Sequence, residues 1–60
     1  MTLQDFVDMA IDSYYGCYVW DNEKEGEVFR GTLDEIPDEL LECELSSWEI
    51  DRNRIGLNIN

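Results

Sequence analysis

Apolar residues in the first quarter of the chain recur at the spacing of an α-helix. Thr2, followed three positions later by Asp5, matches a capping box at the start of such a helix. Gly16 suits the left-handed position just past its end. We therefore predict a helix from about residue 3 to about residue 15. Its apolar stripe consists of Leu3, Phe6, Val7, Ala10, Ile11 and Tyr14.

The next two segments have the composition of a β-hairpin. Residues 17–21 are rich in aromatic and β-branched side chains, and residues 27–31 carry Val28 and Phe29. The polar residues 22–26 between them form a hairpin loop in which Gly26 is expected to supply a positive φ. In the first strand, Tyr18 and Trp20 alternate with Cys17 and Val19.

That alternation places two aromatic side chains on one face of the predicted sheet and two smaller side chains on the other. A single helix covers only one face of a sheet. We therefore expect an exposed aromatic patch, which would mark a partner surface or a homodimer contact.

The residues between positions 32 and 42 change in character. Their apolar positions Leu33, Ile36, Leu40 and Leu41 give a helical spacing over a short stretch. Pro37 prevents one continuous helix, because it lacks an N–H and its ring crowds the preceding turn. We predict one or two single helical turns, with Pro37 opening the second.

The C-terminal segment predicts a second hairpin, whose turn is formed by residues 51–54. Ile55, Leu57 and Ile59 alternate with polar or small residues, which is typical of a strand with one buried face. Trp48 and Ile50 alternate in the same way on the partner strand.

Cys43 and Leu45 have the opposite parity to Trp48 and Ile50. If all four side chains face the core, one extra residue must be absorbed near positions 46 and 47 as a β-bulge. The predicted architecture is thus one α+β domain spanning residues 1–60. It has a four-stranded antiparallel sheet of two hairpins, an N-terminal helix packed on one face and a short helical connector.

Charge narrows the classes of function that fit this fold. The 60 residues contain 15 acids, four bases and no histidine, for a net charge of −11. Such a protein repels nucleic acid and anionic membranes, and it attracts basic surfaces in a salt-sensitive way. We therefore expect a basic protein partner, with no direct nucleic-acid or membrane binding.

Residue types also argue against catalysis and against a bound cofactor. No histidine is present to act as a base for Cys17 or Cys43, and two thiols without histidine do not make a structural zinc site. A chain this short leaves little room for a ligand pocket of about 300 Å³ or more. We predict a non-enzymatic cytoplasmic protein with no cofactor or metal, in which both cysteines are reduced and structural.

One loop offers an alternative chemistry. Asp21, Glu23, Glu25 and Gly26 match positions one, three, five and six of a calcium-binding EF-hand loop. Thr32 occupies the twelfth position, where a glutamate is required, and the flanking segments read as strands. An acidic hairpin loop is the favoured interpretation, with weak calcium binding as the alternative.

The acidic residues themselves are the remaining candidates for a binding surface. Asp5, Asp8 and Asp12 are three and four residues apart, which is roughly 4.5 and 6 Å along a helix axis. Phosphates on one DNA strand have a similar spacing of about 3.4 Å. If acidic sets share a face, a DNA-binding groove could accept them. The candidate partner-binding residues are Asp5, Asp8, Asp12, Glu23, Glu25, Asp34, Glu35, Asp38 and Glu39.

Four short stretches carry a resemblance to known proteins. They are residues 28–31 (Val-Phe-Arg-Gly), 34–37 (Asp-Glu-Ile-Pro), 47–48 (Ser-Trp) and the alternating segment 55–59. In this layout the chain resembles small acidic proteins of bacteriophages and mobile elements, including anti-CRISPR proteins of the DNA-mimic type. None of these stretches has a known mechanism, so the resemblance assigns no functional residue.

What the resemblance implies is an inhibitor in the bacterial host cell. It would occupy the basic DNA- or PAM-binding surface of a nucleic-acid-binding defence complex, such as a CRISPR effector subunit. The alternative is a small phage interaction or structural module that binds through its aromatic sheet face. The pattern leaves open whether the protein is a monomer or a homodimer.

Overall fold

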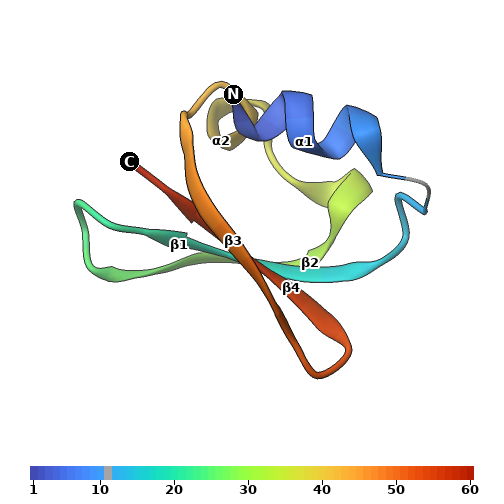
Figure 1. The fold of residues 1–60 in the computed structure, drawn as a ribbon. Helices are drawn as coiled ribbons and strands as arrows, with labels where there is room; N and C mark the ends of the chain where they lie inside the picture. The colour runs from blue at the N-terminus through green and yellow to red at the C-terminus, as the bar shows by residue number, and fades with distance from the viewer. Residues whose placement is uncertain (11) are drawn as a thin grey trace.

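The fold is α+β, with a four-stranded sheet and a layer of short helices on one of its faces (Figure 1). The structure, a computed structural model, describes residues 1–10 and 12–60. In chain order the elements are α1 (Leu3–Met9), β1 (Gly16–Asp21), β2 (Gly26–Thr32), the 3₁₀ turn η1 (Leu33–Glu35), α2 (Asp38–Leu41), β3 (Leu45–Asp51) and β4 (Arg54–Ile59).

The sheet is mixed, so the prediction of a purely antiparallel sheet is wrong. Its strand order is β2-β1-β4-β3, and the central strands β1 and β4 run parallel. The residues from η1 to the start of β3 carry the chain from one sheet edge to the other, which lets β4 return beside β1 in the same direction. Both predicted hairpins are present, because each is formed by local antiparallel pairing.

The core lies between the helical layer and the face of the sheet that we call the inner face. Its side chains come from α1, β1, the η1 turn with the residue that follows it, and β4, and none is more than 5% exposed. The central strands supply most of them, since both neighbours of each are strands. The core consists of Leu3, Cys17, Val19, Leu33, Ile36, Leu57 and Ile59.

Helix α1 begins as predicted and ends early. The Thr2 hydroxyl accepts a hydrogen bond from the Asp5 N–H at 3.2 Å, and Asp5 Oδ2 accepts one from the Thr2 N–H at 3.0 Å. Ala10 is already extended, with ψ 134°. The Asp12 side chain then accepts from the Tyr14 N–H at 2.9 Å, a local bond that competes with a helix.

Two hydrogen bonds to η1 hold the segment after α1 in its non-helical course. The N–H groups of Leu33 and Asp34 donate to the carbonyls of Tyr15 and Ser13, at 3.1 and 2.9 Å. Tyr14, predicted to lie on the buried stripe, is 75% exposed as a result. Ile11, also assigned to that stripe, lies outside the described residues.

Glycine conformations differ from the prediction at two positions. Gly16 is the first residue of β1 and does not terminate a helix. Gly26 opens β2, and the positive φ of that turn belongs to Glu25, at 53°. Both glycines are therefore extended residues that begin strands of the sheet.

The connector and the predicted bulge in the second hairpin follow the prediction. Pro37 is the N-cap of α2, so it separates η1 from the second helical turn. The β3–β4 register shifts between Leu45 and Ser47, which confirms the β-bulge. Trp48 and Ile50 pair with inner-face residues of β4, but they are 55% and 58% exposed and do not belong to the buried core. β3 is an edge strand, and from α1 the Phe6 ring lies 5.6 Å from the Trp48 ring, centre to centre.

Candidate functional site

Carboxylates are concentrated in the helical layer. We use this name for residues 1–15 and 32–44, which contain α1, η1 and α2. These segments hold nine of the fifteen acidic residues and no lysine or arginine. All four basic side chains lie on the strands of the sheet or in their turns. The acids of the layer are Asp5, Asp8, Asp12, Asp34, Glu35, Asp38, Glu39, Glu42 and Glu44.

Tertiary contacts bring the separate acidic segments of the layer together. The hydrogen bonds from η1 to residues 13 and 15 place Asp12 next to the turn that carries Asp34 and Glu35. At the other end, the Leu3 N–H donates to the Cys43 carbonyl at 2.9 Å, and α1 packs beside α2. A shallow hollow between these two helices is lined by Thr2, Gln4, Asp38, Leu41 and Glu42.

Several of these carboxylates also stabilise their own segments. Asp5 completes the α1 capping box, and Asp8 accepts from the Gln4 amide at 2.7 Å. Glu35 accepts from both the N–H and the hydroxyl of Thr32, at 3.2 and 2.9 Å. The Thr32 hydroxyl also lies within hydrogen-bonding distance of Asp34.

Each of the three helical elements has at least one acidic residue in its first turn and no basic residue in its last turn. An acid near a helix N-terminus is favoured by the unpaired N–H groups there. Asp38 and Glu39 occupy this position in α2. Part of the acidity of the layer therefore has a local structural cause.

Two of the predicted binding residues lie elsewhere. Glu23 and Glu25 are in the β1–β2 turn, whereas the other seven lie in the helical layer. Asp21 Oδ1 accepts from the N–H groups of Glu23 and Lys24 at 2.9 and 3.3 Å, which fixes this turn.

The residues of the predicted calcium loop form a tight hairpin turn between β1 and β2. Across residues 1–10 and 12–60, no group of three or more cysteine, aspartate and glutamate side chains is arranged to hold a metal ion. The carboxylate of Asp21, the first position of the motif, faces backbone N–H groups of its own turn.

Three arginines lie close together at the end of the first hairpin that is far from its turn. Sequence patterns did not predict this cluster. Arg30, Arg52 and Arg54 line a hollow together with Asp51 and Asn53. Arg30 is bound to Glu27 at 2.6 Å, and this pairing raises the pKa of its guanidinium. The positions of these arginines along the sequence do not indicate a cluster, because they come together only through the strand order β2-β1-β4-β3.

The outer face of the sheet, which lacks a helical layer, carries the predicted aromatic pair. Tyr18 and Trp20 alternate with the buried Cys17 and Val19, and Trp20 is 39% exposed. The Arg30 guanidinium lies 5.5 Å from the centre of the Tyr18 ring, within cation–π range. Burial is the main cause that raises the pKa of the Tyr18 hydroxyl, and the charge of Glu49 adds to it.

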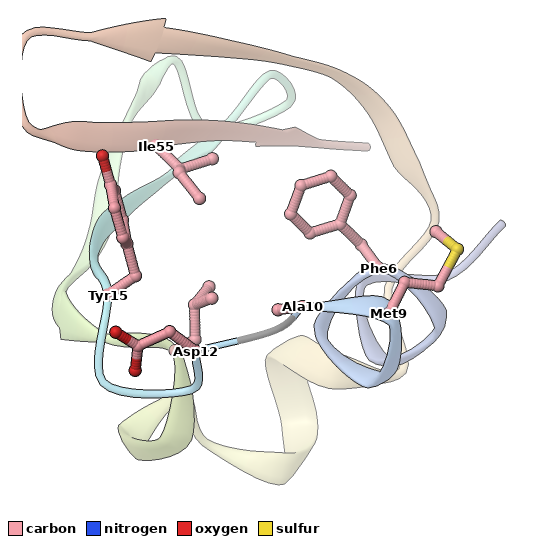
Figure 2. A pocket seen from close by; sticks show the side chains of 7 residues that line it. Phe6, Met9, Ala10, Asp12, Tyr15 and Ile55 are labelled. Carbon is pink, nitrogen blue, oxygen red and sulfur yellow. The ribbon is translucent and has the colours of Figure 1, made fainter.

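On the inner side, an apolar hollow lies between α1 and the sheet (Figure 2). Its volume of about 380 Å³ exceeds what the length of the chain led us to expect. The lining is mostly apolar, and Asp12 is the one charged residue among the lining residues. It is formed by Phe6, Met9, Ala10, Asp12, Tyr15, Leu33 and Ile55.

The two cysteines differ in their environments. Cys17 is fully buried on the inner face, where burial raises the pKa of its thiol to about 11. Cys43 is half-buried, and its thiol donates to the Glu39 carbonyl at 3.5 Å. Both thiols are free, and a neutral buried thiol is a poor nucleophile.

Comparison of the chain with protein-family profiles, with curated proteins and with solved structures finds no match. No helix in the described part of the chain is both long enough and apolar enough to cross a membrane.

Proposed function

We propose that this protein is a stoichiometric inhibitor whose helical layer mimics DNA. In this proposal, the layer occupies the basic DNA- or PAM-binding surface of a bacterial nucleic-acid-binding defence complex, such as a CRISPR effector. The supporting observation is the separation of charge, with nine carboxylates and no basic side chain in residues 1–15 and 32–44.

Electrostatics gives this arrangement a mechanism. A basic groove that accommodates DNA is surrounded by bound anions, and an acidic protein carries bound cations. Docking releases both sets of ions, so the association is fast at low salt and weakens steeply as salt increases. In this proposal, discrete carboxylates on short helical turns supply negative charges at set positions, as phosphates do along a DNA strand.

A competition experiment tests the proposal. Purified CRISPR effector complexes are mixed with fluorescently labelled target DNA, and DNA binding is followed by anisotropy as this protein is added. We expect DNA to be displaced at about one protein per complex, with an affinity that falls at least tenfold between about 0.05 M and 0.2 M salt.

Charge reversal in two places shows which surface is responsible. Asp8→Lys/Glu39→Lys alters the helical layer, and Glu23→Lys/Glu25→Lys makes the same change in net charge in the β1–β2 turn. We expect the first variant to lose inhibition and the second to retain most of it. Equal inhibition by both variants and the unchanged protein would contradict the proposal.

A second candidate function is supported by the outer-face aromatics, since Trp20 is 39% exposed beside the half-buried Tyr18. A binding module that uses Tyr18 and Trp20 would bury apolar surface, so its association would depend little on salt. Trp20→Ala would abolish that binding, whereas Trp48→Ala, on the inner face, would leave it intact. Pull-downs at low and high salt with these two variants distinguish this module from a DNA mimic.

A further inference from the structure

Strand β3 leaves one long edge of the sheet without a neighbouring strand (Figure 1). Residues 46–51 are all exposed along this edge. An edge strand presents a row of backbone N–H and C=O groups that can pair with another extended segment. Residues 46–51 lie outside the helical layer and border it at Phe6, so binding at the edge does not require the proposed DNA mimicry.

The start of this edge is already paired with an extended segment of the same chain. Thr2 forms an antiparallel bridge with Glu44, and the Leu45 N–H donates to the Met1 carbonyl at 2.9 Å. Backbone pairing on this side of β3 is therefore geometrically accessible. Among the described residues this pairing involves Glu44 and Leu45, directly before residues 46–51.

The two faces of β3 differ in chemistry. Trp48 and Ile50 pair with Leu57 and Ile55, so they lie on the inner face, where they are 55% and 58% exposed. The intervening Glu49 pairs with Gly56 and belongs to the outer face. An added strand would thus meet apolar side chains at every second position and an acid between them.

We propose that the β3 edge binds an extended segment of a partner protein in which apolar and basic residues alternate. Its apolar side chains cover Trp48 and Ile50, and a lysine or arginine faces Glu49. Its backbone extends the sheet from β3, the mode known as β-augmentation. A second copy of this chain fits the edge poorly, because it would bring together two proteins that each carry a net charge of −11.

A designed peptide tests this pairing directly. The probe is an eight-residue peptide that alternates lysine and valine, titrated into ¹⁵N-labelled protein. The control peptide has the same composition, with four lysines followed by four valines. We expect the alternating peptide to bind about tenfold more tightly, because only it can match backbone pairing and both faces together. The amides of residues 46–51 should shift and become protected from hydrogen exchange.

Charge reversal at one position separates strand pairing from diffuse attraction. Glu49→Lys should weaken binding of the alternating peptide about fivefold, and it should strengthen binding of a glutamate–valine peptide. Glu39→Lys, with the same change in net charge in α2, should alter either affinity by less than about twofold. A proline at the centre of the probe should abolish its binding.

Three results would overturn the proposal. They are equal binding of the two lysine–valine peptides, equal effects of Glu49→Lys and Glu39→Lys, or amide shifts that lie mainly outside residues 46–51. Failure here would leave the DNA-competition experiment unaffected, since that experiment depends on the helical layer.

Discussion

Tyr18 on β1 and Gly56 on the parallel strand β4 occupy complementary space on the outer face of the sheet. A Cβ atom at position 56 would lie 2.6 Å from the Tyr18 hydroxyl oxygen and 3.1 Å from Cγ of Glu49. The absence of a side chain at Gly56 therefore creates the space into which Tyr18 packs. The contact joins the two hairpins at the parallel pair that sequence patterns did not predict.

Gly56→Ala should destabilise the protein by about 1–3 kcal/mol, because the new methyl group overlaps the Tyr18 side chain. The free energy of unfolding is measured by urea denaturation. Gly26→Ala is the matched control, since the nearest atom to its Cβ would be 3.8 Å away. If Gly56→Ala were as stable as Gly26→Ala, Tyr18 would not pack over Gly56.

The Thr2→Ala variant should lose about 1 kcal/mol of stability, because it removes the hydroxyl that caps α1. Thr2→Ser keeps the hydroxyl and should unfold within a few tenths of a kcal/mol of the unchanged protein. Thermal unfolding followed by circular dichroism measures both. A loss of equal size in the serine variant would assign the effect to the methyl group.

Cys17 should make stability depend on pH above about pH 9. The pKa of its thiol is raised from 9.0 to about 11 by burial, so unfolding releases a proton in this range. The stabilisation is complete below pH 9 and is lost as pH rises through 11. Over that window it amounts to roughly 3 kcal/mol at most.

Urea denaturation of the unchanged protein and of Cys17→Ala at several pH values measures this effect. The stability difference between them should shrink as pH increases. A parallel thiol titration with a disulfide reagent should modify the half-buried Cys43 before Cys17. A difference that stays constant from pH 9 to 11 would contradict the burial of the Cys17 thiol.

Added salt should stabilise the isolated protein. A net charge of −11 on 60 residues produces self-repulsion in the folded state, and salt screens it. Raising NaCl from about 0.01 M to about 1 M shortens the screening length from about 30 to 3 Å, and we expect a gain of about 1 kcal/mol or more.

The variant Asp8→Asn/Glu39→Gln tests the source of that gain. With two fewer charges in the helical layer, it should be more stable at low salt and should respond less to added salt. Equal salt responses in the two proteins would show that the layer is not where the repulsion arises. A layer that costs stability in isolation is consistent with carboxylates kept for a partner.

Elements with local causes were predictable from the chain. The Thr2–Asp5 capping box, the break at Pro37 and the bulge at residues 45–47 depend on side chains a few positions apart. The face of Tyr18 and Trp20 follows from strand alternation alone. Helix α1 was overestimated because its end is set by hydrogen bonds between residues 13–15 and η1, which are distant in sequence.

The candidate site was predictable in part for the same reason. Acid counts along the chain were enough to nominate seven of the nine carboxylates of the helical layer, and strand patterns were enough to predict both hairpins. Strand patterns do not say how two hairpins join, because backbone hydrogen bonds are satisfied locally in either arrangement.

The way in which the two hairpins join is explained by the burial of the most apolar strands, β1 and β4. With β1 and β4 at the centre, Cys17, Val19, Leu57 and Ile59 are all within 1% of complete burial. The same packing left β3 at an edge with Trp48 exposed, gathered three arginines at one end and separated Glu23 and Glu25 from the other candidate acids. Periodicity reports which side of a strand is apolar, and long-range packing decides whether that side has enough neighbours to be buried.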